Sequence, residues 1–323
     1  MNMNVLVTRA IPEPGITLLK QTCTTVDVSP HDRVLSSDEL LAMSRGRDGL
    51  LTMVTDPVNA QLLDACPTIR AISNFGVGTN NIDIPECTRR RIGVANTPGV
   101  LTDATAETTW ALIFAAARGV IEGEIAVRTA QWPGWGPPQY LGMGITGKTL
   151  GIIGAGRIGQ RVAEMSRGFN MRILYHSRTV RRDFERSTGA RFTDLPTLLR
   201  TADIISIHTP LTARTRHLIG ASQLAMLKPT AILINTSRGP VIDEAALVES
   251  LREKRIFAAG LDVYEYEPEL TTGLRDLLNV VLLPHIGSAT VETRTKMALM
   301  SAEHLISMLQ GRRPACPVNP ELW

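Results

Sequence analysis

The stretch Leu150-Gly151-Ile152-Ile153-Gly154-Ala155-Gly156-Arg157-Ile158-Gly159 decides the fold of this 323-residue chain. Its glycines have the GxGxxG spacing and directly follow an apolar run, while Ile158, Val162 and Met165 share one face of a helix. A strand, a glycine turn and a helix in this order form a cradle whose backbone N–H groups bind the pyrophosphate of a dinucleotide. We therefore predict a dinucleotide site at this turn.

The three glycines have different expected roles. Gly154 allows the tight turn, Gly156 lets the backbone approach the pyrophosphate, and Gly159 lets the helix pack closely on the strand. A glycine turn without a ligand is the alternative, which the flanking strand and helix disfavour. The predicted cofactor contacts of this turn are Gly154, Ala155, Gly156, Arg157, Ile158 and Gly159.

The end of the next apolar run bears on which dinucleotide is bound. NAD-specific sites usually place an acidic residue there to bind the ribose 2′-hydroxyl. This sequence has no acid at that point, and Arg178 can donate charge-assisted hydrogen bonds to a 2′-phosphate. A solvated basic turn around Arg178, Arg181 and Arg182 is the alternative. We predict NADP in preference to NAD, with contacts from His176, Ser177, Arg178 and Thr179.

The apolar runs around this motif predict a parallel sheet. Six runs alternate with helical segments, at residues 150–153, 172–175, 204–207, 231–234, 258–261 and 280–283. This count is typical of a doubly wound dinucleotide domain. The first hundred residues show a similar alternation, and 323 residues exceed the usual size of one domain. We predict an α/β fold with two doubly wound parallel-sheet domains.

Two features predict how the chain is divided. Pro98-Gly99 interrupts the pattern before a helical segment at 102–118, and residues 291–309 have the pattern of an amphipathic helix that can return to the first domain. We therefore expect a discontinuous, flavodoxin-like substrate and catalytic domain formed by residues 1–98 and 287–323. A Rossmann-type cofactor domain, residues 99–286, is inserted into it.

Composition excludes several classes of function. Hydrophobic residues make up 44% of the chain and charged residues 20%, as in soluble globular proteins. The net charge is +3 with dispersed basic residues, so no nucleic-acid partner is expected. The four cysteines are far apart without a CxxC pair, which predicts no metal site and no disulfide framework. No signal-peptide pattern and no run near the ~18 apolar residues of a membrane span are present, so we expect a cytoplasmic protein without a membrane partner.

Three polar residues follow late strands of the predicted sheet: Arg238, Glu267 and His285. Ligands of open α/β sheets bind beyond the carboxyl ends of the strands, which makes these residues candidates for the chemistry. Hydride addition to a ketone creates an alkoxide, and histidine is suited to protonate it near neutral pH. A glutamate beside the imidazole favours the protonated ring. Arginine offers a planar donor fork that can hold a substrate carboxylate and polarise the carbonyl oxygen.

Each of these residues alone has a simpler interpretation as a solvated side chain, and it is their shared place at one sheet edge that favours a site. His208 also follows a strand and is a competing acid, although no carboxylate is close to it in the sequence. His31, His217 and His304 are expected at the surface.

The chain resembles the D-isomer-specific 2-hydroxyacid dehydrogenases over essentially its whole length, in particular their glyoxylate/hydroxypyruvate reductase branch. The resemblance implies an oxidoreductase that reduces small 2-oxo acids, such as glyoxylate and hydroxypyruvate, by hydride transfer from NADPH or NADH. It also implies a homodimer. The segments that carry it are Asn96-Thr97-Pro98 with Ala104-Thr105-Ala106-Glu107, Gly147–Gly154, Ile234–Gly239, Gly260–Glu265 and Pro284–Ser288.

The same resemblance implies roles for single residues. Arg238, Glu267 and His285 match the catalytic set of the family, with Arg238 and His285 also in contact with the substrate. Glu267 is preferred to Glu265 because the acid of the family directly precedes a proline, as Glu267 does here.

Further contacts are implied for the substrate and the cofactor. The backbone N–H groups of Val77 and Gly78 are expected to bind the substrate carboxylate. Trp135 of the partner subunit is expected to reach the active site, with simple packing in a dimer as its alternative role. Asp262 is expected to contact the nicotinamide carboxamide. The remaining implied cofactor contacts are Thr209, Pro210, Thr236, Ser237 and Gly287.

Alternative functions stay open at this stage. Within the family they include 2-ketogluconate reduction and the oxidation of phosphoglycerate or D-lactate. From a different class, related chains serve as NAD(H)-sensing corepressors, in which binding of the dinucleotide matters more than turnover.

Overall fold

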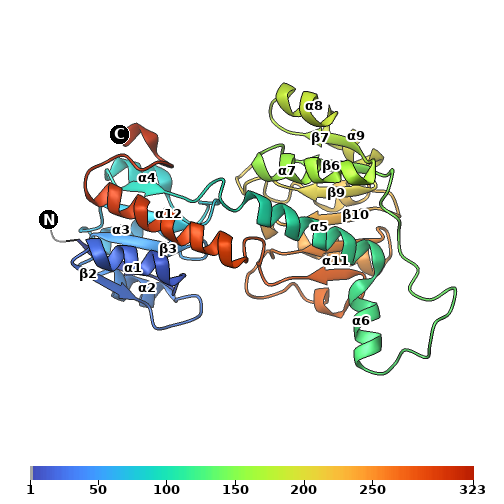
Figure 1. Ribbon diagram of the computed structural model, residues 1–323, viewed down its shortest axis with the longest axis horizontal. Helices are drawn as coiled ribbons and strands as arrows, with labels where there is room; N and C mark the ends of the chain where they lie inside the picture. Colours follow the sequence, from blue (N-terminus) through green and yellow to red (C-terminus); the bar gives the residue numbers. More distant parts are fainter. Residues whose placement is uncertain (1–2) are drawn as a thin grey trace. The chain divides into compact units, whose positions relative to one another are not determined.

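Two parallel β-sheets organise the chain, each in its own unit (Figure 1). The computed structural model describes residues 3–323. The N-terminal unit is the chain up to Leu101 together with Ala289–Trp323, and the inserted unit is Thr102–Ser288. The chain thus leaves the first sheet once and returns to it once.

The sheet of the N-terminal unit has, among the described residues, five parallel strands in the order β2-β1-β3-β4-β5. This is the flavodoxin-like order of a doubly wound sheet. The strands are β1 (Asn4–Val7), β2 (Thr25–Val28), β3 (Gly49–Met53), β4 (Ala71–Phe75) and β5 (Gly93–Ala95). The helices are α1 (Glu13–Thr22), α2 (Ser37–Ser44), α3 (Ala60–Ala65), α4 (Ile84–Arg89), α12 (Val291–Leu309) and the short 3₁₀ helix η4 (Pro320–Leu322).

Helix α12 belongs to the N-terminal unit, where it packs beside α1 (Figure 1). Gly15 of α1 lies so close to α12 that an added Cβ would be 2.7 Å from the carbonyl oxygen of Ala298. Helix α12 begins at a cap, because the Thr290 side chain accepts from the Thr293 N–H at 3.1 Å. The face of the sheet that packs on α2, α3 and α4 buries Leu50 and Ile72.

The sheet of the inserted unit has seven parallel strands within the described residues, in the order β12-β11-β10-β9-β6-β7-β8. The chain crosses from one half of the sheet to the other between β8 and β9, so β6 and β9 become neighbours at the switch point. This is the Rossmann order with one added strand. The predicted fold class, two doubly wound parallel sheets, is confirmed.

After α6, at least one helix separates each strand of the inserted unit from the next. The strands are β6 (Thr149–Ile153), β7 (Arg172–His176), β8 (Arg191–Phe192), β9 (Ile204–Ile207), β10 (Ile232–Asn235), β11 (Ala258–Leu261) and β12 (Val280–Leu282). The helices are α5 (Thr102–Arg118), α6 (Val120–Arg128), α7 (Arg157–Met165), α8 (Arg182–Thr188), α9 (Leu195–Thr201), α10 (Ala221–Leu224) and α11 (Glu244–Arg252). The 3₁₀ helices are η1 (Ser166–Phe169), η2 (Gly239–Val241) and η3 (Leu274–Asp276).

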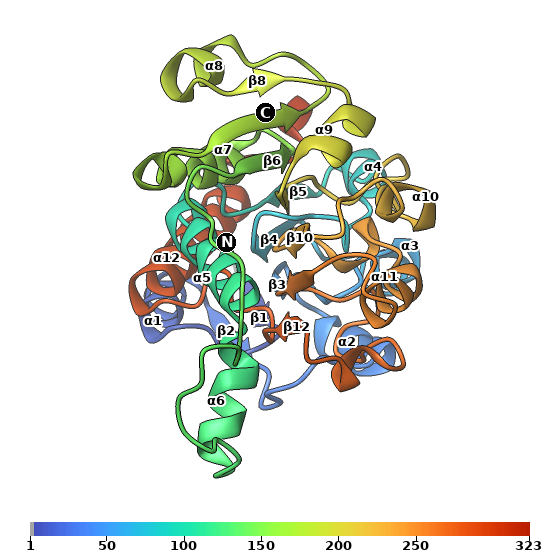
Figure 2. The ribbon, with the colours of Figure 1, turned by 90° about the vertical axis from the view of Figure 1, so that its right-hand side faces the viewer.

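Strand β8 differs from the sequence prediction, which has six strands in this unit. It consists of two residues at the edge of the sheet, and both are exposed (Figure 2). Two exposed residues make no apolar run, so a method that counts apolar runs overlooks such a strand.

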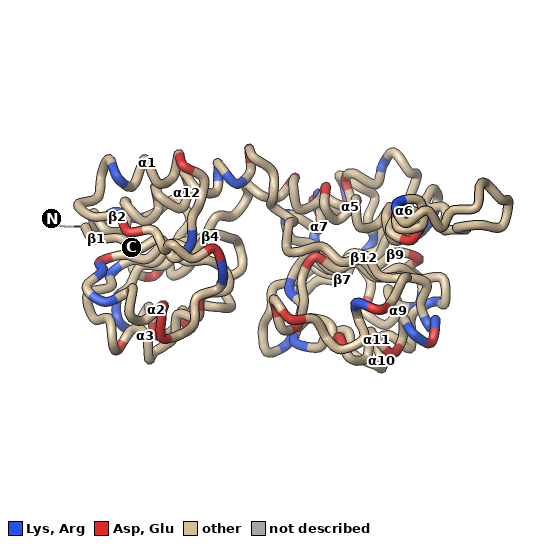
Figure 3. The backbone as a smooth tube through the Cα atoms, turned by 90° about the horizontal axis from the view of Figure 1, so that it is seen from below, with Lys and Arg blue, Asp and Glu red and all other residues tan. Residues whose placement is uncertain are grey.

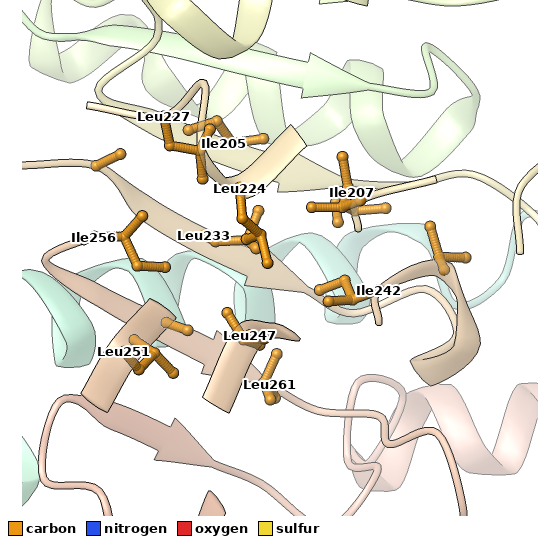
Figure 4. Packing of buried hydrophobic residues seen from close by; sticks show 14 of the residues in the cluster. Ile205, Ile207, Leu224, Leu227, Leu233, Ile242, Leu247, Leu251, Ile256 and Leu261 are labelled. Carbon is orange, nitrogen blue, oxygen red and sulfur yellow. The ribbon is translucent and has the colours of Figure 1, made fainter. Parts of the chain in front are cut away.

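The core of the inserted unit lies on both faces of its sheet. Helices α5 and α7 cover one face with Leu112, Ile113 and Val162. The residues that pack the other face, shown in Figure 4, include Ile205, Ile207, Leu224, Leu233, Ile242, Leu247, Leu251 and Leu261. Because both faces are covered, β6, β9, β10 and β11 are buried along their whole length and appear in the sequence as continuous apolar runs.

Charged residues of both signs alternate along the surface of each unit (Figure 3). No large region of either backbone carries Lys and Arg alone, which agrees with the small net charge of +3. Within residues 3–323 we find no helix whose length and hydropathy would let it cross a membrane.

Candidate active site

The carboxyl ends of β10, β11 and β12 bring the three predicted catalytic residues into one region of the inserted unit. Asn235, Leu261 and Leu282, the last residues of these strands, are register partners in the sheet. Arg238, Glu267 and His285 lie on the loops that follow. Since parallel strands end at the same edge, their following loops are neighbours.

His285 and Glu267 form a hydrogen-bonded pair. The Nδ1 atom of His285 lies 2.9 Å from Oε2 of Glu267, and the side chains are 35% and 25% exposed. The second carboxylate oxygen of Glu267 accepts from the backbone N–H of Tyr264 at 3.0 Å. Because the carboxylate accepts at Nδ1, Nε2 is the ring nitrogen that can exchange a proton with another molecule.

The environment keeps Glu267 ionised. Burial is the largest single influence and raises the pKa of its carboxyl. The hydrogen bond and charge of His285, the Tyr264 N–H and the charge of Arg238 together outweigh it, so the pKa lies below its usual range. An anion is therefore present beside the imidazole at neutral pH. The carboxylate holds the imidazole ring in one orientation through its hydrogen bond to Nδ1.

Arg238 is held by the turn that follows β10. The Asn235 side chain donates to the Arg238 carbonyl at 2.9 Å and accepts from the Ser237 N–H at 3.0 Å. Burial lowers the pKa of the Arg238 guanidinium, and the charge of Glu267 acts in the opposite direction. Gly239 packs on the backbone of Tyr264 so closely that any Cβ would overlap with it. The turn of Arg238 is thus fixed directly against the loop of Glu267.

The two glutamates of the Glu-Tyr-Glu-Pro segment have different partners. Glu265 accepts from His217 at 2.6 Å and from Arg216 at 3.2 Å, and only 4% of its side chain is exposed. The buried Glu244 accepts from the Glu265 N–H at 2.6 Å. Glu265 therefore joins its loop to Arg216, His217 and Glu244. Glu267 is the glutamate that contacts the imidazole of His285.

Asp262 anchors the turn that carries His285. Its two carboxylate oxygens accept from the N–H groups of Ile286 and Gly287, both at 2.7 Å. Burial raises the pKa of this carboxyl, which is 1% exposed, although both backbone hydrogen bonds oppose the shift. His285 itself has φ of +55°, a left-handed conformation that such anchoring helps to maintain.

His208 is not suited to be the acid. Its Nε2 atom lies 2.8 Å from the Ser206 hydroxyl, and burial lowers its pKa to about 3. A histidine with this pKa is unprotonated at neutral pH and cannot supply a proton there. The expected surface position of His304 is wrong, because α12 buries this side chain to 3% exposure on the face that packs on the sheet, whereas His31 and His217 are exposed.

The glycine turn after β6 has the conformation that the motif predicts. Gly154 has φ of +99°, and a Cβ there would lie 2.6 Å from the His208 carbonyl oxygen. A Cβ on Gly159 would overlap with the Gly154 carbonyl oxygen, so α7 can approach β6 only through glycine. Gly156 is different, because no atom lies within 4 Å of a Cβ placed there. The residue before α7 thus borders open space that can take a phosphate group.

In the segment after β7, the guanidinium groups of Arg178 and Arg181 have no ion pair or hydrogen bond within residues 3–323. Arg178 is exposed, whereas Arg182 pairs with Glu185 at 2.9 Å. His176 contacts the Thr193 carbonyl through Nδ1 at 3.1 Å, and the Ser177 hydroxyl donates to the Thr179 carbonyl at 2.6 Å. Arg178 is therefore available to an anionic ligand.

The other predicted contacts fall in three places. At the carboxyl edge of the inserted sheet, Thr209 and Thr236 are buried to 9% exposure. Val77 and Gly78 follow β4 in the N-terminal unit. Trp135 lies in the loop after α6 and is 83% exposed. The residues that sit at the edge of the inserted sheet are Ala155, Arg157, Ile158, Thr179, Thr209, Pro210, Thr236, Ser237 and Gly287.

Sequence reasoning missed two residues that contact the loop of Val77 and Gly78, namely Asn74 and Asn96. Asn74 is the one amide in the buried strand β4, two residues before Gly76. An amide near the end of a strand that is buried along its whole length, just ahead of a glycine-rich loop, was the available signal.

The chain is similar to known dehydrogenases in sequence and in fold. Residues 110–287 match the model of the D-isomer specific 2-hydroxyacid dehydrogenase NAD binding domain. The chain is 48% identical to a glyoxylate reductase of Aeropyrum pernix, over 98% of this chain and 96% of the relative. It is similar to the structure of a glyoxylate reductase from Paecilomyes thermophila, with a TM-score of 0.88, 31% identity and 99% of each chain covered.

A third relative concerns the cofactor. The structure of an NADPH-dependent glyoxylate/hydroxypyruvate reductase from Sinorhizobium meliloti, in complex with NADP and malonate, superposes with a TM-score of 0.87 at 30% identity. The match covers 100% of this chain and 98% of that one.

The fold, the glycine turn and the polar residues at the sheet edge define a nicotinamide-dependent oxidoreductase. More narrowly, the chain belongs to the family of D-isomer-specific 2-hydroxyacid dehydrogenases. The predicted family is thus confirmed.

Two substitutions in the glycine turn should separate folding from cofactor binding. Gly159→Ala should lower the free energy of unfolding by about 1–3 kcal/mol, because the added methyl group overlaps with the Gly154 backbone. Gly156→Ala should leave the stability of the free protein unchanged, since its Cβ meets no atom within 4 Å, and should weaken dinucleotide binding about 10-fold or more. Thermal unfolding and fluorescence titration with NADPH measure the two effects. Equal losses of stability in both variants would contradict the assigned roles.

Proposed function

We propose that this protein reduces glyoxylate and hydroxypyruvate to the corresponding 2-hydroxy acids with a nicotinamide dinucleotide as hydride donor. The observation that carries the proposal is the His285–Glu267 hydrogen bond of 2.9 Å beside Arg238, at the carboxyl edge of a dinucleotide-binding sheet. The names of relatives that are 43–48% identical over nearly the whole chain support the same substrates.

The two units have different proposed tasks. The inserted unit, close to the predicted bounds 99–286, binds the dinucleotide and carries Arg238, Glu267 and His285. The N-terminal unit, close to the predicted residues 1–98 and 287–323, contributes the backbone N–H groups of Val77 and Gly78 to the substrate carboxylate. The unit bounds of Leu101 and Ala289 support this division.

The chain's own residues supply the proton and the orientation of the substrate. The bound dinucleotide supplies the hydride that adds to C2 of the 2-oxo acid. His285 donates a proton from Nε2 to the oxygen on C2, while Glu267 holds Nδ1 and stabilises the imidazolium. Arg238 binds the substrate carboxylate and polarises the carbonyl oxygen.

The residues present fit a dinucleotide. Open space beside Gly156 precedes α7, and the N-terminus of that helix favours an anion. Thr209, Pro210, Thr236, Ser237 and Gly287 are proposed to line the rest of the cofactor. Asp262 is proposed to contact the nicotinamide carboxamide in addition to its hydrogen bonds to Ile286 and Gly287.

Kinetics with a substrate panel tests the proposed function. Glyoxylate and hydroxypyruvate should be reduced with higher kcat/KM than 2-ketogluconate and pyruvate, as followed by loss of nicotinamide absorbance. Preferred turnover of phosphoglycerate, D-lactate or 2-ketogluconate would place the protein in another branch. Binding of NADH without turnover of any of these acids would favour a dinucleotide-sensing protein.

Removal of the imidazole should abolish most of the reduction without loss of the cofactor. His285→Ala should lower kcat for glyoxylate by about 10²–10⁴-fold, the usual contribution of a general acid, and leave the Kd of NADPH nearly unchanged. Glu267→Gln should move the decline of kcat at high pH to lower pH, because a neutral amide no longer favours the protonated ring.

His208→Ala is the matched control for this pair, since it removes a histidine at the same sheet edge whose pKa is too low for proton donation. It should change kcat by no more than about 3-fold. Near-full turnover of His285→Ala, or a pH profile of Glu267→Gln that does not move, would show that another group is the acid.

We propose NADP as the preferred cofactor, bound at its 2′-phosphate by His176, Ser177, Arg178 and Thr179. The exposed guanidinium of Arg178, without an internal partner among residues 3–323, supports this preference. The acid that binds the 2′-hydroxyl of NAD is absent from the segment Tyr175–Thr179.

Arg178→Ala should weaken NADPH binding by about 10–100-fold, as loss of a charged hydrogen bond does, and change NADH binding by less than about 3-fold. Titration of both dinucleotides measures the difference. Arg182→Ala is the control, because Arg182 already pairs with Glu185 at 2.9 Å, and it should affect NADPH less. Equal losses for both cofactors in Arg178→Ala would reject NADP.

We further propose a homodimer formed through α6 and the loop after it. In Figures 1 and 2 this segment extends away from the sheet of its unit. Its large apolar side chains are exposed, and an uncovered patch of this kind is typical of an interface. They are Val120, Ile121, Ile125, Val127, Trp132, Trp135, Tyr140 and Leu141, exposed by 40% to 83%. In the dimer, Trp135 of the partner subunit would reach the active site.

Charges placed on this segment should prevent the dimer. The double variant Val127→Glu with Leu141→Glu should elute as a monomer, because both side chains, 62% and 74% exposed, would lie in the interface. Light scattering after size exclusion measures the mass. Leu278→Glu, at a residue that is 65% exposed but outside the segment, should stay dimeric. A dimer that survives both charges would place the interface elsewhere.

The location of the protein is proposed to be the cytoplasm. The four cysteines are all free thiols in the structure, with Cys23, Cys66 and Cys87 buried. Unpaired thiols are typical of a reducing compartment.

A further inference from the structure

We call the loop after β4 (Gly76–Thr79) the substrate loop. Hydrogen bonds to three of its successive carbonyl groups hold it in place. The Gly76 carbonyl accepts from the Thr97 N–H at 3.1 Å. The Val77 carbonyl accepts from the Asn96 side-chain amide at 2.7 Å, and the Gly78 carbonyl accepts from the Asn74 side-chain amide at 2.7 Å. Each of these three carbonyls therefore has a donor on or just after β4 or β5.

These three hydrogen bonds fix the direction of the N–H groups of the loop. In a trans peptide the carbonyl of one residue and the N–H of the next point in opposite directions. With three carbonyls turned inward, the N–H groups of Val77, Gly78 and Thr79 are turned outward. Nothing within residues 3–323 accepts a hydrogen bond from them. Consecutive N–H groups on one side of a loop form a site for an anion such as a carboxylate.

The orientation of the Asn74 amide is fixed by its neighbours. Its Oδ1 atom accepts from the Thr52 hydroxyl at 3.0 Å and from the Asn81 amide at 3.3 Å, which leaves Nδ2 to donate to Gly78. The Asn81 amide also donates to the carbonyls of Met53 and Asp56, both at 3.0 Å. Asn74 is fully buried, and a buried amide with all these bonds has one stable orientation.

Behind this amide lies a frame of four polar residues, Thr8, Thr52, Asp56 and Asn81. Asp56, which is 3% exposed, accepts from the Met53 N–H at 2.7 Å and from the Thr8 hydroxyl. Asn74 and the frame residues thus come from the carboxyl ends of β1, β3 and β4, from the loop after β3 and from the segment just after the substrate loop. Because these hydrogen bonds hold the Asn74 amide in place, a change in this side chain is transmitted to the substrate loop through Gly78.

We propose that Asn74 and Asn96 are positioning residues that turn the N–H groups of Val77, Gly78 and Thr79 toward the substrate carboxylate. The proposal rests on the proposed function. It implies that these two amides set the preference for an acid that carries a carboxylate next to its carbonyl, over an aldehyde of similar size without one. Neither amide touches the substrate.

Asn74→Asp tests the proposal with almost no change of shape. At pH 8 the new carboxylate cannot donate to the Gly78 carbonyl, so that peptide loses its fixed orientation. We expect KM for glyoxylate and the Kd of oxalate, measured with saturating NADPH, to rise about 10-fold or more, as loss of an oriented anion contact does. We expect kcat and the Kd of NADPH to change by less than about 3-fold, and kcat/KM for glycolaldehyde, which lacks the carboxylate, to be unchanged.

Asn319→Asp is the matched control. Its amide is also buried, at 1% exposure in the same unit, and it donates to the Ile92 carbonyl and accepts from the Val94 N–H, both at 2.9 Å. This variant should lower Tm without a change in the ratio of kcat/KM between glyoxylate and glycolaldehyde. A purely structural role of Asn74 would give the same result as this control.

Asn96→Ala keeps the test decisive if Asn74→Asp does not fold, because Asn96 is only half-buried. It should raise the Kd of oxalate and KM for glyoxylate in the same selective way. If both variants fold and keep the wild-type KM for glyoxylate and Kd of oxalate, the proposal is overturned. If only Asn96→Ala folds, wild-type values in that variant overturn it. The two variants can weaken oxalate binding as predicted while the wild-type protein does not reduce glyoxylate. That result would overturn the proposed function and support the role of the amides.

Discussion

Gly239 lies against the backbone of Tyr264 with no room for a Cβ, and the arrangement of the site depends on this contact. It joins the turn of Arg238 to the loop of Glu267. The Tyr264 N–H donates to Glu267, and Glu267 in turn accepts from His285. The geometry of the three polar side chains is therefore set by backbone packing at the ends of adjacent parallel strands, which leaves little freedom to each side chain alone.

The same residue type has opposite properties at two points of this sheet edge. The His208 imidazole contacts the neutral Ser206 hydroxyl, and burial lowers its pKa to about 3. His285 has the ionised Glu267 at its Nδ1 atom and keeps 35% of its side chain exposed. The two histidines therefore differ in their partners, a neutral hydroxyl for His208 and a carboxylate for His285.

Much of this was predictable, because apolar runs mark buried strands and ligands bind after the carboxyl ends of parallel strands. The glycine turn, the family and the strand-end position of His285 follow from such local patterns. Strand β8 does not, since Arg191 and Phe192 are exposed and form a strand only through their neighbour β7. Asn74 and His304 also escape the sequence, because the donors and acceptors that surround a buried polar group come from distant segments.

The last residues of the chain complete the sheet that the first residues begin. Val318 donates to the Val94 carbonyl at 2.7 Å, and Leu305 and Leu309 of α12 pack on Gly49 of β3. During synthesis the ribosome makes the five strands of the N-terminal unit first, yet their covering helix appears only after residue 290. Beside α1, the nascent chain therefore lacks the helix that covers the rest of this apolar sheet face until the inserted unit has been made, and this interval exposes the face to aggregation and to chaperones.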